Sequence, residues 1–397
     1  MSEPLYQLVY ERLRDDIRGH RFPVGERLPS EAELTAEHKV STITLKRALS
    51  LLRDDGFIVR RPRLGTFVVS DVATSTTVSL VGRPLIGCVI TNFDDTFGTH
   101  ILGGLLDSMQ TSANLILKRS LGDPAAEDGL IRSLIESGMQ ALILQPSSSQ
   151  YVPPAVLELV LRQFPVVILD RVFDGVPVST VCSDNVAAAK MATEYLFTLG
   201  HDHVGLVTSA GRMSTTENRR AGFLHAHAAA NVPHEDDNEF RDLQSTTPGS
   251  DVLPEDDVAR LQVFIANHPD LTGFVASEYN IALLLKEACR RAGRSVPEDV
   301  SIVCFDHPDN FYDPAYFRFT HIQQNQAQMG VEAVERVLEQ LRKPSTIRKI
   351  ALPTKLVEGQ STTARRTERI PAYAVALRRR GAVGVVDRSG AADAGNS

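Results

Sequence analysis

The sequence predicts an α/β protein of two parts: a small helical domain that ends in a β-hairpin, and a larger domain built on doubly wound parallel sheets. Three observations predict this. Apolar residues recur at helical spacing through the first seventy residues, short apolar runs alternate with helix-length segments from residue 85 onward, and a small, polar stretch separates the two regions at 71–84. The chain has 397 residues and is 43% apolar, so it can bury the cores of more than one domain.

The first domain, 1–70, is predicted to hold three helices and a hairpin. The first helix has an apolar face made of Tyr6, Val9, Leu13 and Ile17. A short second helix begins at Ser30, because Glu33 three residues later completes a capping box. A third helix begins at Ser41, and two strands at 57–60 and 66–69 follow it. This order of elements is that of a winged helix-turn-helix, in which the third helix enters the major groove of DNA.

The charge pattern agrees with a DNA-binding surface confined to this domain. The whole chain has a net charge of −7, yet residues 39–63 hold seven Lys and Arg against two Asp. On the third helix, Lys46 and Arg47 can reach guanine or phosphate, and the outward Ile43 suits a thymine methyl group. The candidate DNA-contacting residues are Ser30, Glu31, Ser41, Thr42, Ile43, Thr44, Lys46, Arg47, Arg61 and Arg63.

Residues 4–69 resemble the DNA-binding domain of the GntR family. The matching stretches are Pro4-Leu5-Tyr6, Leu28-Pro29-Ser30-Glu31-x-Glu33-Leu34, Val40-Ser41-x-x-Thr44-Leu45-Lys46-Arg47-Ala48-Leu49 and Gly65-Thr66-Phe67-Val68. The chain departs from the family at Lys39 and Arg63, where glycine is common, and at Thr42, where the family usually has Arg. Since position 42 contacts DNA in the family, the operator preference of its members does not carry over.

The second region shows the βα alternation of parallel sheets. Apolar runs at 86–90, 141–145, 166–170, 204–209, 273–276 and 302–305 alternate with helical segments such as 100–113, 185–199 and 326–341. Ligands bind such sheets at the carboxyl ends of the strands, and polar side chains gather there in this sequence. Carboxylates, an arginine, an amide and an aromatic ring suit a ligand with many hydroxyl groups.

Residues 85–363 resemble the LacI/GalR sensor domain, which is itself similar to periplasmic sugar-binding proteins. The most specific matches are Leu199-Gly200-His201 and the stretch from Pro297 to Asp306. The resemblance implies two lobes, 85–200 with 325–350 and 201–323 with 351–363. It places effector contacts on Asp95, Phe97, Ser148, Arg219, Glu278, Asp306 and Gln324. Glu278 and Tyr279 depart from the usual pattern, as does Gly359, and no hinge helix is evident in 70–84.

A GntR-type domain joined to a LacI-type sensor is the combination found in arabinose repressors of Gram-positive bacteria. The resemblance therefore implies a homodimeric repressor that a monosaccharide effector releases from a palindromic double-stranded operator. Two alternatives stay open. The effector could be a nucleoside or purine, or the chain could be a sugar-binding α/β protein whose N-terminal domain contacts other proteins.

No enzyme or cofactor motif accompanies these features. The sequence has no GxGxxG after the first strand of the large region, no GxxxxGK[ST] and no GxSxG, and His201 and His203 lack a third metal ligand. We therefore expect no catalytic residues, no cofactor and no metal. No apolar run approaches membrane length and the four cysteines form no CxxC pair, so we expect a cytoplasmic protein with reduced cysteines and no membrane partner. The Ala-, Arg- and Gly-rich segment 364–397 is predicted to be a disordered tail.

Overall fold

The chain forms two compact units, Met1–Gly82 and Arg83–Ser397. The structure, a computed structural model, describes residues 5–54, 57–61, 65–69, 83–211, 213–308 and 316–365. Most of the predicted linker (71–84) and of the predicted tail (364–397) lies outside these ranges, as does Arg63. Within the described residues, no helix is both long enough and apolar enough to cross a membrane.

The N-terminal unit is a winged helix-turn-helix. Its elements are α1 (Leu5–Arg18), α2 (Glu31–His38), α3 (Thr42–Asp54), β1 (Ile58–Arg61) and β2 (Gly65–Val68). The two strands pair in antiparallel register, with Ile58 opposite Val68. The predicted apolar faces of the helices meet in one core together with Phe57, which is fully buried. The capping box is confirmed, because the Glu33 N–H donates to Ser30 Oγ over 3.3 Å and the Ser30 N–H donates to Glu33 Oε2 over 2.7 Å.

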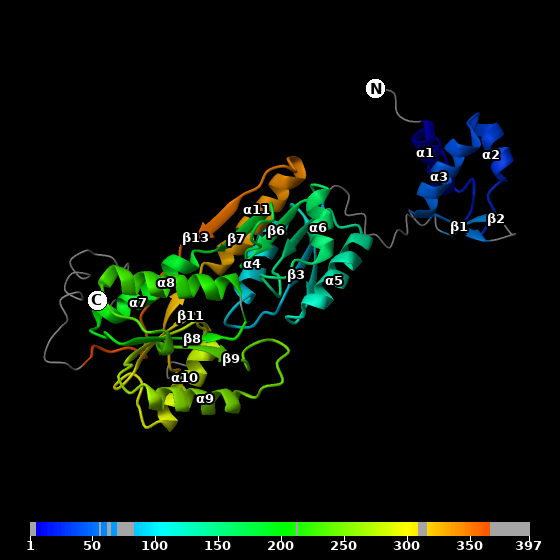
Figure 1. Cartoon of the computed structure of the whole chain (residues 1–397). Coiled ribbons are helices and arrows are strands. Elements are labelled where there is room, and N and C mark those ends of the chain that lie inside the picture. The colour runs from blue at the N-terminus through cyan, green and yellow to red at the C-terminus, as the bar shows by residue number, and fades with distance from the viewer. Residues whose placement is uncertain are drawn as a thin grey trace, which may run out of the picture. The chain divides into compact units, whose positions relative to one another are not determined.

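The larger unit contains two six-stranded sheets, each covered by helices (Figure 1). The first sheet has the order β13-β7-β6-β5-β3-β4, and the second has the order β14-β12-β11-β10-β8-β9. Apart from β14, which runs antiparallel to β12, all neighbouring strands are parallel. In each sheet the strand order reverses at one point, between β3 and β5 in the first and between β8 and β10 in the second. Ligands of doubly wound sheets bind at such points.

The strands of this unit are β3 (Leu85–Ile90), β4 (Asn114–Arg119), β5 (Ala141–Leu144), β6 (Val166–Leu169), β7 (Ser179–Ser183), β8 (Val204–Ser209), β9 (Glu239–Leu243), β10 (Gly273–Ala276), β11 (Ser301–Phe305), β12 (Thr320–Gln323), β13 (Lys349–Leu352) and β14 (Lys355–Val357). The helices are α4 (Thr99–Met109), α5 (Pro124–Glu136), α6 (Pro154–Leu161), α7 (Asn185–Thr198), α8 (Ser214–Ala230), η1 (Asp236–Asn238), α9 (Pro254–Asn267), α10 (Tyr279–Arg291) and α11 (Gln326–Arg342). Buried strands such as β5 and β6 are wholly apolar because helices cover both faces of the sheet.

The chain passes between the two lobes three times, after β7, after β12 and after β13. Helix α7 packs with α8 against the second sheet, where Ala188, Leu196 and Phe197 are fully buried. The first lobe therefore ends near residue 184 and not at 200 as the sequence predicted. Strand β13 extends the first sheet to residue 352, slightly beyond the predicted 350. Local patterns cannot assign a helix to a lobe, because α7 has apolar residues suited to either sheet.

Helices α4 and α11 pack at backbone distance in the first lobe. A Cβ on Gly330 would lie 2.3 Å from the carbonyl oxygen of Ile101, and one on Gly104 would lie 2.1 Å from that of Ala327. Only glycine fits at these two positions, so the crossing brings the start of α11 beside the loop that precedes α4. This places the first residues of α11 next to the polar strand ends of both lobes.

Candidate functional site

The N-terminus of α3 is exposed and carries the side chains expected to reach DNA. Ser41 begins the helix, since its Oγ accepts the N–H of Thr44 over 3.2 Å. One face of α3 buries Leu45, Ala48 and Leu52 in the core of the unit. The opposite face leaves four side chains exposed to solvent: Thr42, Ile43, Lys46 and Arg47.

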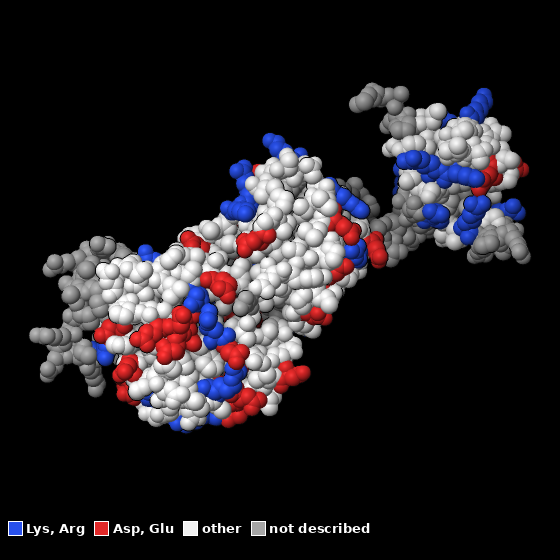
Figure 2. All heavy atoms as spheres, viewed as in Figure 1, with Lys and Arg blue, Asp and Glu red and all other residues white. Residues whose placement is uncertain are grey.

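Ile43 is the most informative of these side chains because it is 81% exposed. An aliphatic side chain beside Lys46 and Arg47 gains nothing from solvent, whereas the methyl group of thymine offers it an apolar contact in the major groove. The guanidinium of Arg47 rests over the ring of Tyr6, 4.8 Å from its centroid, and would leave this ring to reach a phosphate or a base. Figure 2 shows Lys and Arg side chains gathered on the visible surface of this unit.

The side chains of the other predicted DNA contacts differ in whether they already have a partner within the protein. The hydroxyl of Ser30 donates to Glu33 over 2.8 Å within the capping box, so it already has a structural partner. Glu31 forms an ion pair with Arg60, 3.4 Å apart, which ties the start of α2 to the hairpin. The side chain of Arg61 and the whole of Arg63 lie outside the described residues, so the wing contacts remain predictions.

A cavity of about 250 Å³ lies between the two lobes of the larger unit. Residues that follow β3, β5, β6, β8, β10 and β11 line it, so it occupies the carboxyl ends of both sheets at their two points of reversal. Five of the seven predicted effector contacts line this cavity, namely Phe97, Arg219, Glu278, Asp306 and Gln324. They come from five separate stretches of the sequence, which the folding of two lobes brings together.

Arg219, on α8, is held in one orientation. Its Nε donates to Asn185 Oδ1 over 2.8 Å, another nitrogen donates to the carbonyl of Ser277, and its guanidinium carbon lies 3.9 Å from the ring centroid of Phe305. The side chain is almost fully buried, and burial lowers its pKa against the opposing effect of Asp306. Such a fixed, planar donor can bind ligand oxygens with little loss of side-chain entropy.

Asp306 follows β11 in a left-handed backbone conformation, with φ of 59°. Both carboxylate oxygens accept hydrogen bonds, from Gln324 Nε2 over 2.6 Å and from Gln326 Nε2 over 3.1 Å. Burial raises the pKa of Asp306 to about 6, although Arg219 and the two amides oppose the change. Gln326 also donates to the carbonyl of Thr96, so one side chain links the wall of the cavity in the second lobe to a loop of the first.

Glu278 immediately precedes α10, two residues after the end of β10. Its carboxylate has no hydrogen-bond partner among the described residues, although Arg219 and Arg171 attract it from across the cavity. Burial raises its pKa. A largely buried carboxylate without a donor is unfavourable, so this side chain is poised to accept hydroxyl groups from a ligand.

Asp95 and Ser148, the other two predicted contacts, do not line the cavity. The neighbour of the first, Asp94, lines it instead, and its Oδ1 accepts the backbone N–H groups of Thr96 and Phe97 over 2.7 and 3.0 Å. The hydroxyl of Ser148 accepts the N–H of Gln150 over 3.1 Å and so caps its own loop. The tight turn after β3 decides which aspartate points inward, and a sequence pattern does not reveal that turn.

Several lining residues of the first lobe are absent from the predicted effector contacts, among them Gln145, Asp170 and Arg171. Gln145 accepts the backbone N–H of Thr91 over 3.1 Å and donates to Asp170 over 3.2 Å. Arg171 lies 3.9 Å from Asp170 and donates to the carbonyl of Pro146. Asp170 and Arg171 directly follow the buried strand β6, a strand end at which the sequence places polar side chains, although the family resemblance did not mark them as effector contacts.

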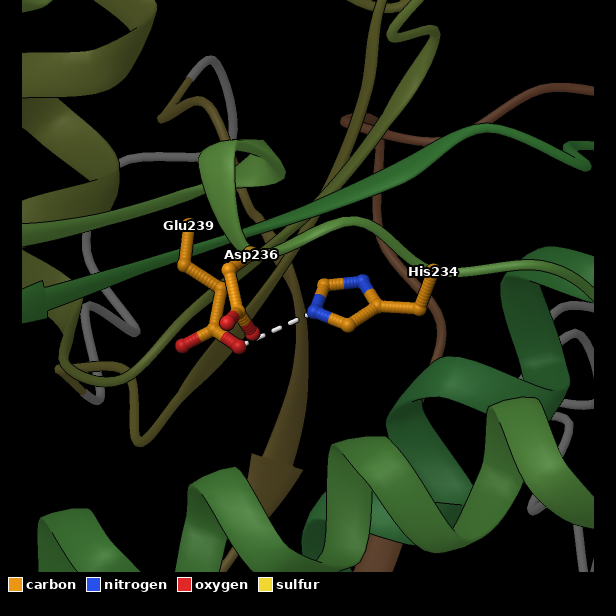
Figure 3. A group of neighbouring side chains, drawn as sticks. All are labelled: His234, Asp236 and Glu239. Atoms are coloured by element: carbon orange, nitrogen blue, oxygen red, sulfur yellow. Dashed lines mark hydrogen bonds and ion pairs between the residues drawn. The ribbon is translucent and has the colours of Figure 1, made fainter.

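A cluster of His234, Asp236 and Glu239 has the composition of a metal site. The side chains point toward one another, with potential ligand atoms within 4.8 Å (Figure 3). However, Arg220 donates to both oxygens of Glu239, over 2.6 and 2.9 Å, and Arg241 lies 3.4 Å away. A cation would have to displace two guanidinium groups, so the cluster is better explained as an ion-pair network.

His201 and His203 do not act as a pair. His201 is buried, and its two ring nitrogens contact Thr272 Oγ1 and the carbonyl of Thr363, each over 3.0 Å. His203 is instead engaged with Asp202 over 3.0 Å. Each histidine therefore has its own structural partners.

Comparisons with known proteins agree with the two units. Residues 5–68 match the family of bacterial regulatory proteins named gntR, and residues 193–362 match a periplasmic binding protein-like domain. An arabinose metabolism transcriptional repressor from Geobacillus stearothermophilus is 28% identical over 347 residues, which cover 85% of this chain and 91% of the relative. The matched domains are those of regulatory and binding proteins, and none is an enzyme domain.

Solved structures show the same fold for the larger unit. The transcription regulator CcpA of Lactococcus lactis aligns with a TM-score of 0.61 at 20% identity, covering 71% of this chain and all of that one. A LacI family regulator from Enterococcus faecium, solved with bound ribose, aligns with a TM-score of 0.58 at 21% identity over the same shares. The chain thus joins a DNA-binding domain of the gntR family of bacterial regulatory proteins to a periplasmic binding protein-like domain with the LacI-type fold.

Proposed function

We propose that this protein is a transcriptional repressor that a neutral monosaccharide releases from its operator. The observation that carries the proposal is the combination of an exposed helix-turn-helix with a cavity at the reversal points of two facing sheets. The similarity to a repressor of arabinose metabolism supports the repressing role. Since the operator is chromosomal, we place the protein in the cytoplasm.

The charges of the cavity favour an uncharged ligand with many hydroxyl groups. Its lining contains four carboxylates and two guanidinium groups: Asp94, Asp170, Glu278, Asp306, Arg171 and Arg219. The excess of negative charge opposes a phosphate or carboxylate on the ligand, while carboxylates readily accept pairs of sugar hydroxyls. Phe97 and Phe305 add aromatic surface for the C–H face of a sugar ring.

A cavity of about 250 Å³ has room for a monosaccharide. The ribose bound to the similar Enterococcus faecium regulator supports a pentose as the first candidate.

Repression further implies a dimer that reads two half-sites of a palindromic operator. Closure of the cleft on a sugar would change the spacing of the two winged domains. The coupling requires only that the sugar prefer the conformation that binds DNA less well. The lac repressor, whose fold is similar, was solved as a dimer bound to its operator.

Two titrations test the proposal. In the first, genomic DNA fragments that the full chain binds are identified, and the affinity of the full chain for them is compared with that of the variant Lys46→Ala/Arg47→Ala. We expect specific binding to be lost and the dependence of log K on log salt to weaken by about one for each phosphate contact removed. Arg132→Ala, in the larger unit, is the control and should leave DNA binding unchanged.

In the second titration, thermal shifts are screened with pentoses, hexoses and nucleosides, and each hit is added to the operator complex. A sugar that stabilises the protein and weakens operator binding supports the proposal. If a nucleoside is the only hit, the effector is a nucleoside and not a monosaccharide, while the proposed role as a repressor still holds. Unchanged operator affinity with every hit would contradict induction by a small molecule.

A further inference from the structure

The two lobes also touch at places where the chain does not pass between them. One of these contacts joins Ser149, in the loop after β5, and Val172, after β6, to Ser214 at the start of α8. Because these residues lie in separate lobes, their hydrogen bonds can break without breaking either sheet. Ser214 lies between Met213 and Thr215, which both line the cavity, so the contact sits at the edge of the ligand site.

Three hydrogen bonds form this contact. Ser149 Oγ donates to Ser214 Oγ over 3.1 Å, and the backbone N–H of Ser214 donates back to Ser149 Oγ over 2.9 Å. The backbone N–H of Val172 donates to Ser214 Oγ over 3.0 Å. Ser214 Oγ thus accepts two hydrogen bonds from the first lobe while its own helix belongs to the second.

A steric contact accompanies these hydrogen bonds at another point of the same interface. Gly122, in the loop after β4, faces Pro248 of the second lobe so closely that an added Cβ would lie 2.7 Å from Pro248 Cβ. Pro248 itself lines the cavity. The two lobes therefore approach each other to van der Waals contact here, and this approach has no room for one more methyl group.

We propose that Ser149, Val172 and Ser214 form a latch that holds the cleft closed. The close van der Waals contact of Gly122 with Pro248 allows the two lobes to approach far enough for the latch to form. Ser214 acts as a positioning residue, because it contacts no ligand itself and instead fixes the distance between the two walls of the cavity. The closed population sets the apparent affinity for an effector, because that affinity is proportional to the fraction of molecules that are closed. Only this regulatory consequence rests on the proposed function.

The latch is tested first without any sugar, so that its failure is distinct from failure of the proposed function. The full chain carrying Ser149→Cys/Ser214→Cys is oxidised, and disulfide formation is followed by mobility on non-reducing gels. The control pair Ser149→Cys/Thr216→Cys places the second thiol on the same helix turn but away from the contact. We expect the first pair to cross-link at least about tenfold faster, because a disulfide requires Cβ atoms within roughly 4.5 Å.

The glycine contact is then tested in the same cross-linking background. Gly122→Ala should slow disulfide formation, because its methyl group holds the lobes apart. Gly138→Ala is the matched control: Gly138 has a similar positive φ, 81° against 77°, but nothing lies within 4 Å of its added Cβ. Both variants share the backbone strain, and only Gly122→Ala adds the clash.

A third measurement uses the native serines. In Ser214→Ala, the amide of Val172 loses its acceptor, and its hydrogen exchange should accelerate by roughly 5- to 30-fold, the equivalent of two ordinary hydrogen bonds. Thr216→Ala should leave this exchange unchanged. Any one of three results would overturn the latch. The first is equal cross-linking rates for the two cysteine pairs, and the second is an equal effect of Gly122→Ala and Gly138→Ala on cross-linking. The third is an unchanged rate of hydrogen exchange at the Val172 amide in Ser214→Ala.

Discussion

Effector binding should weaken at acid pH, because a carboxylate in the cavity must be ionised to accept sugar hydroxyl groups at full strength. Asp306 is a carboxylate of this cavity, and burial raises its pKa to about 6. Its two oxygens also accept hydrogen bonds from Gln324 and Gln326. Protonation of one oxygen would place a donor against the amide donor at that oxygen and weaken that contact.

The magnitude follows from the pKa. Above pH 7 Asp306 is ionised in most molecules, and at pH 5 only about one molecule in eleven retains the charge. If the ionised form alone binds, the dissociation constant rises about tenfold between pH 8 and pH 5. Burial raises the pKa of Glu278 as well, so its titration acts in the same direction.

The assay is calorimetric titration of the full chain with the sugar found by the thermal-shift screen, at several pH values. Asp306→Asn should bind more weakly at pH 8 and should lose the tenfold component of the pH dependence. The melting temperature of each protein at each pH controls for partial unfolding. An affinity that stays constant from pH 8 to pH 5 in the folded wild-type protein would refute the reasoning about Asp306.

Three further predictions concern stability. Ser30→Ala removes the capping box and should lower the unfolding free energy of the N-terminal unit by about 1 kcal/mol, measured by denaturant titration. Arg220→Ala should destabilise the larger unit by about 2 kcal/mol at pH 7, because Glu239 loses its bidentate partner while it keeps His234 and Arg241. Although burial opposes it, hydrogen bonding lowers the pKa of Glu239 to about 2, so this stabilisation is complete above its ordinary pKa of 4.5 and lost as pH falls toward 2. Thermal melts from pH 7 to pH 3 should therefore show the deficit of the variant shrinking. Gly330→Ala should lower the melting temperature, since its Cβ would meet a carbonyl of α4, whereas Gly103→Ala, with open space around its Cβ, should not; equal melting temperatures would contradict the close crossing.

Local chemistry is sufficient to predict the DNA-binding unit from the sequence. A capping box fixes the start of α2, and Ser41 fixes the start of α3. The helical spacing then separates the buried Leu45 from the exposed Ile43 without any long-range information. The wing is different, because Arg63 lies outside the described residues and its predicted contact with DNA stays a prediction.

The sequence by itself predicted the three helices and the hairpin of the N-terminal unit, six of the twelve strands of the larger unit, and the polar residues that follow several of these strands. Only the tertiary structure decided which of them converge: Asp94 lines the cavity in place of Asp95, Ser148 turns back to its own loop, and α7 packs in the second lobe. The physical reason is the separation along the sequence of the residues on which each feature depends. Caps and apolar faces depend on residues three or four apart, whereas the cavity depends on a turn after β3 and on three passages of the chain between lobes, which no local pattern encodes.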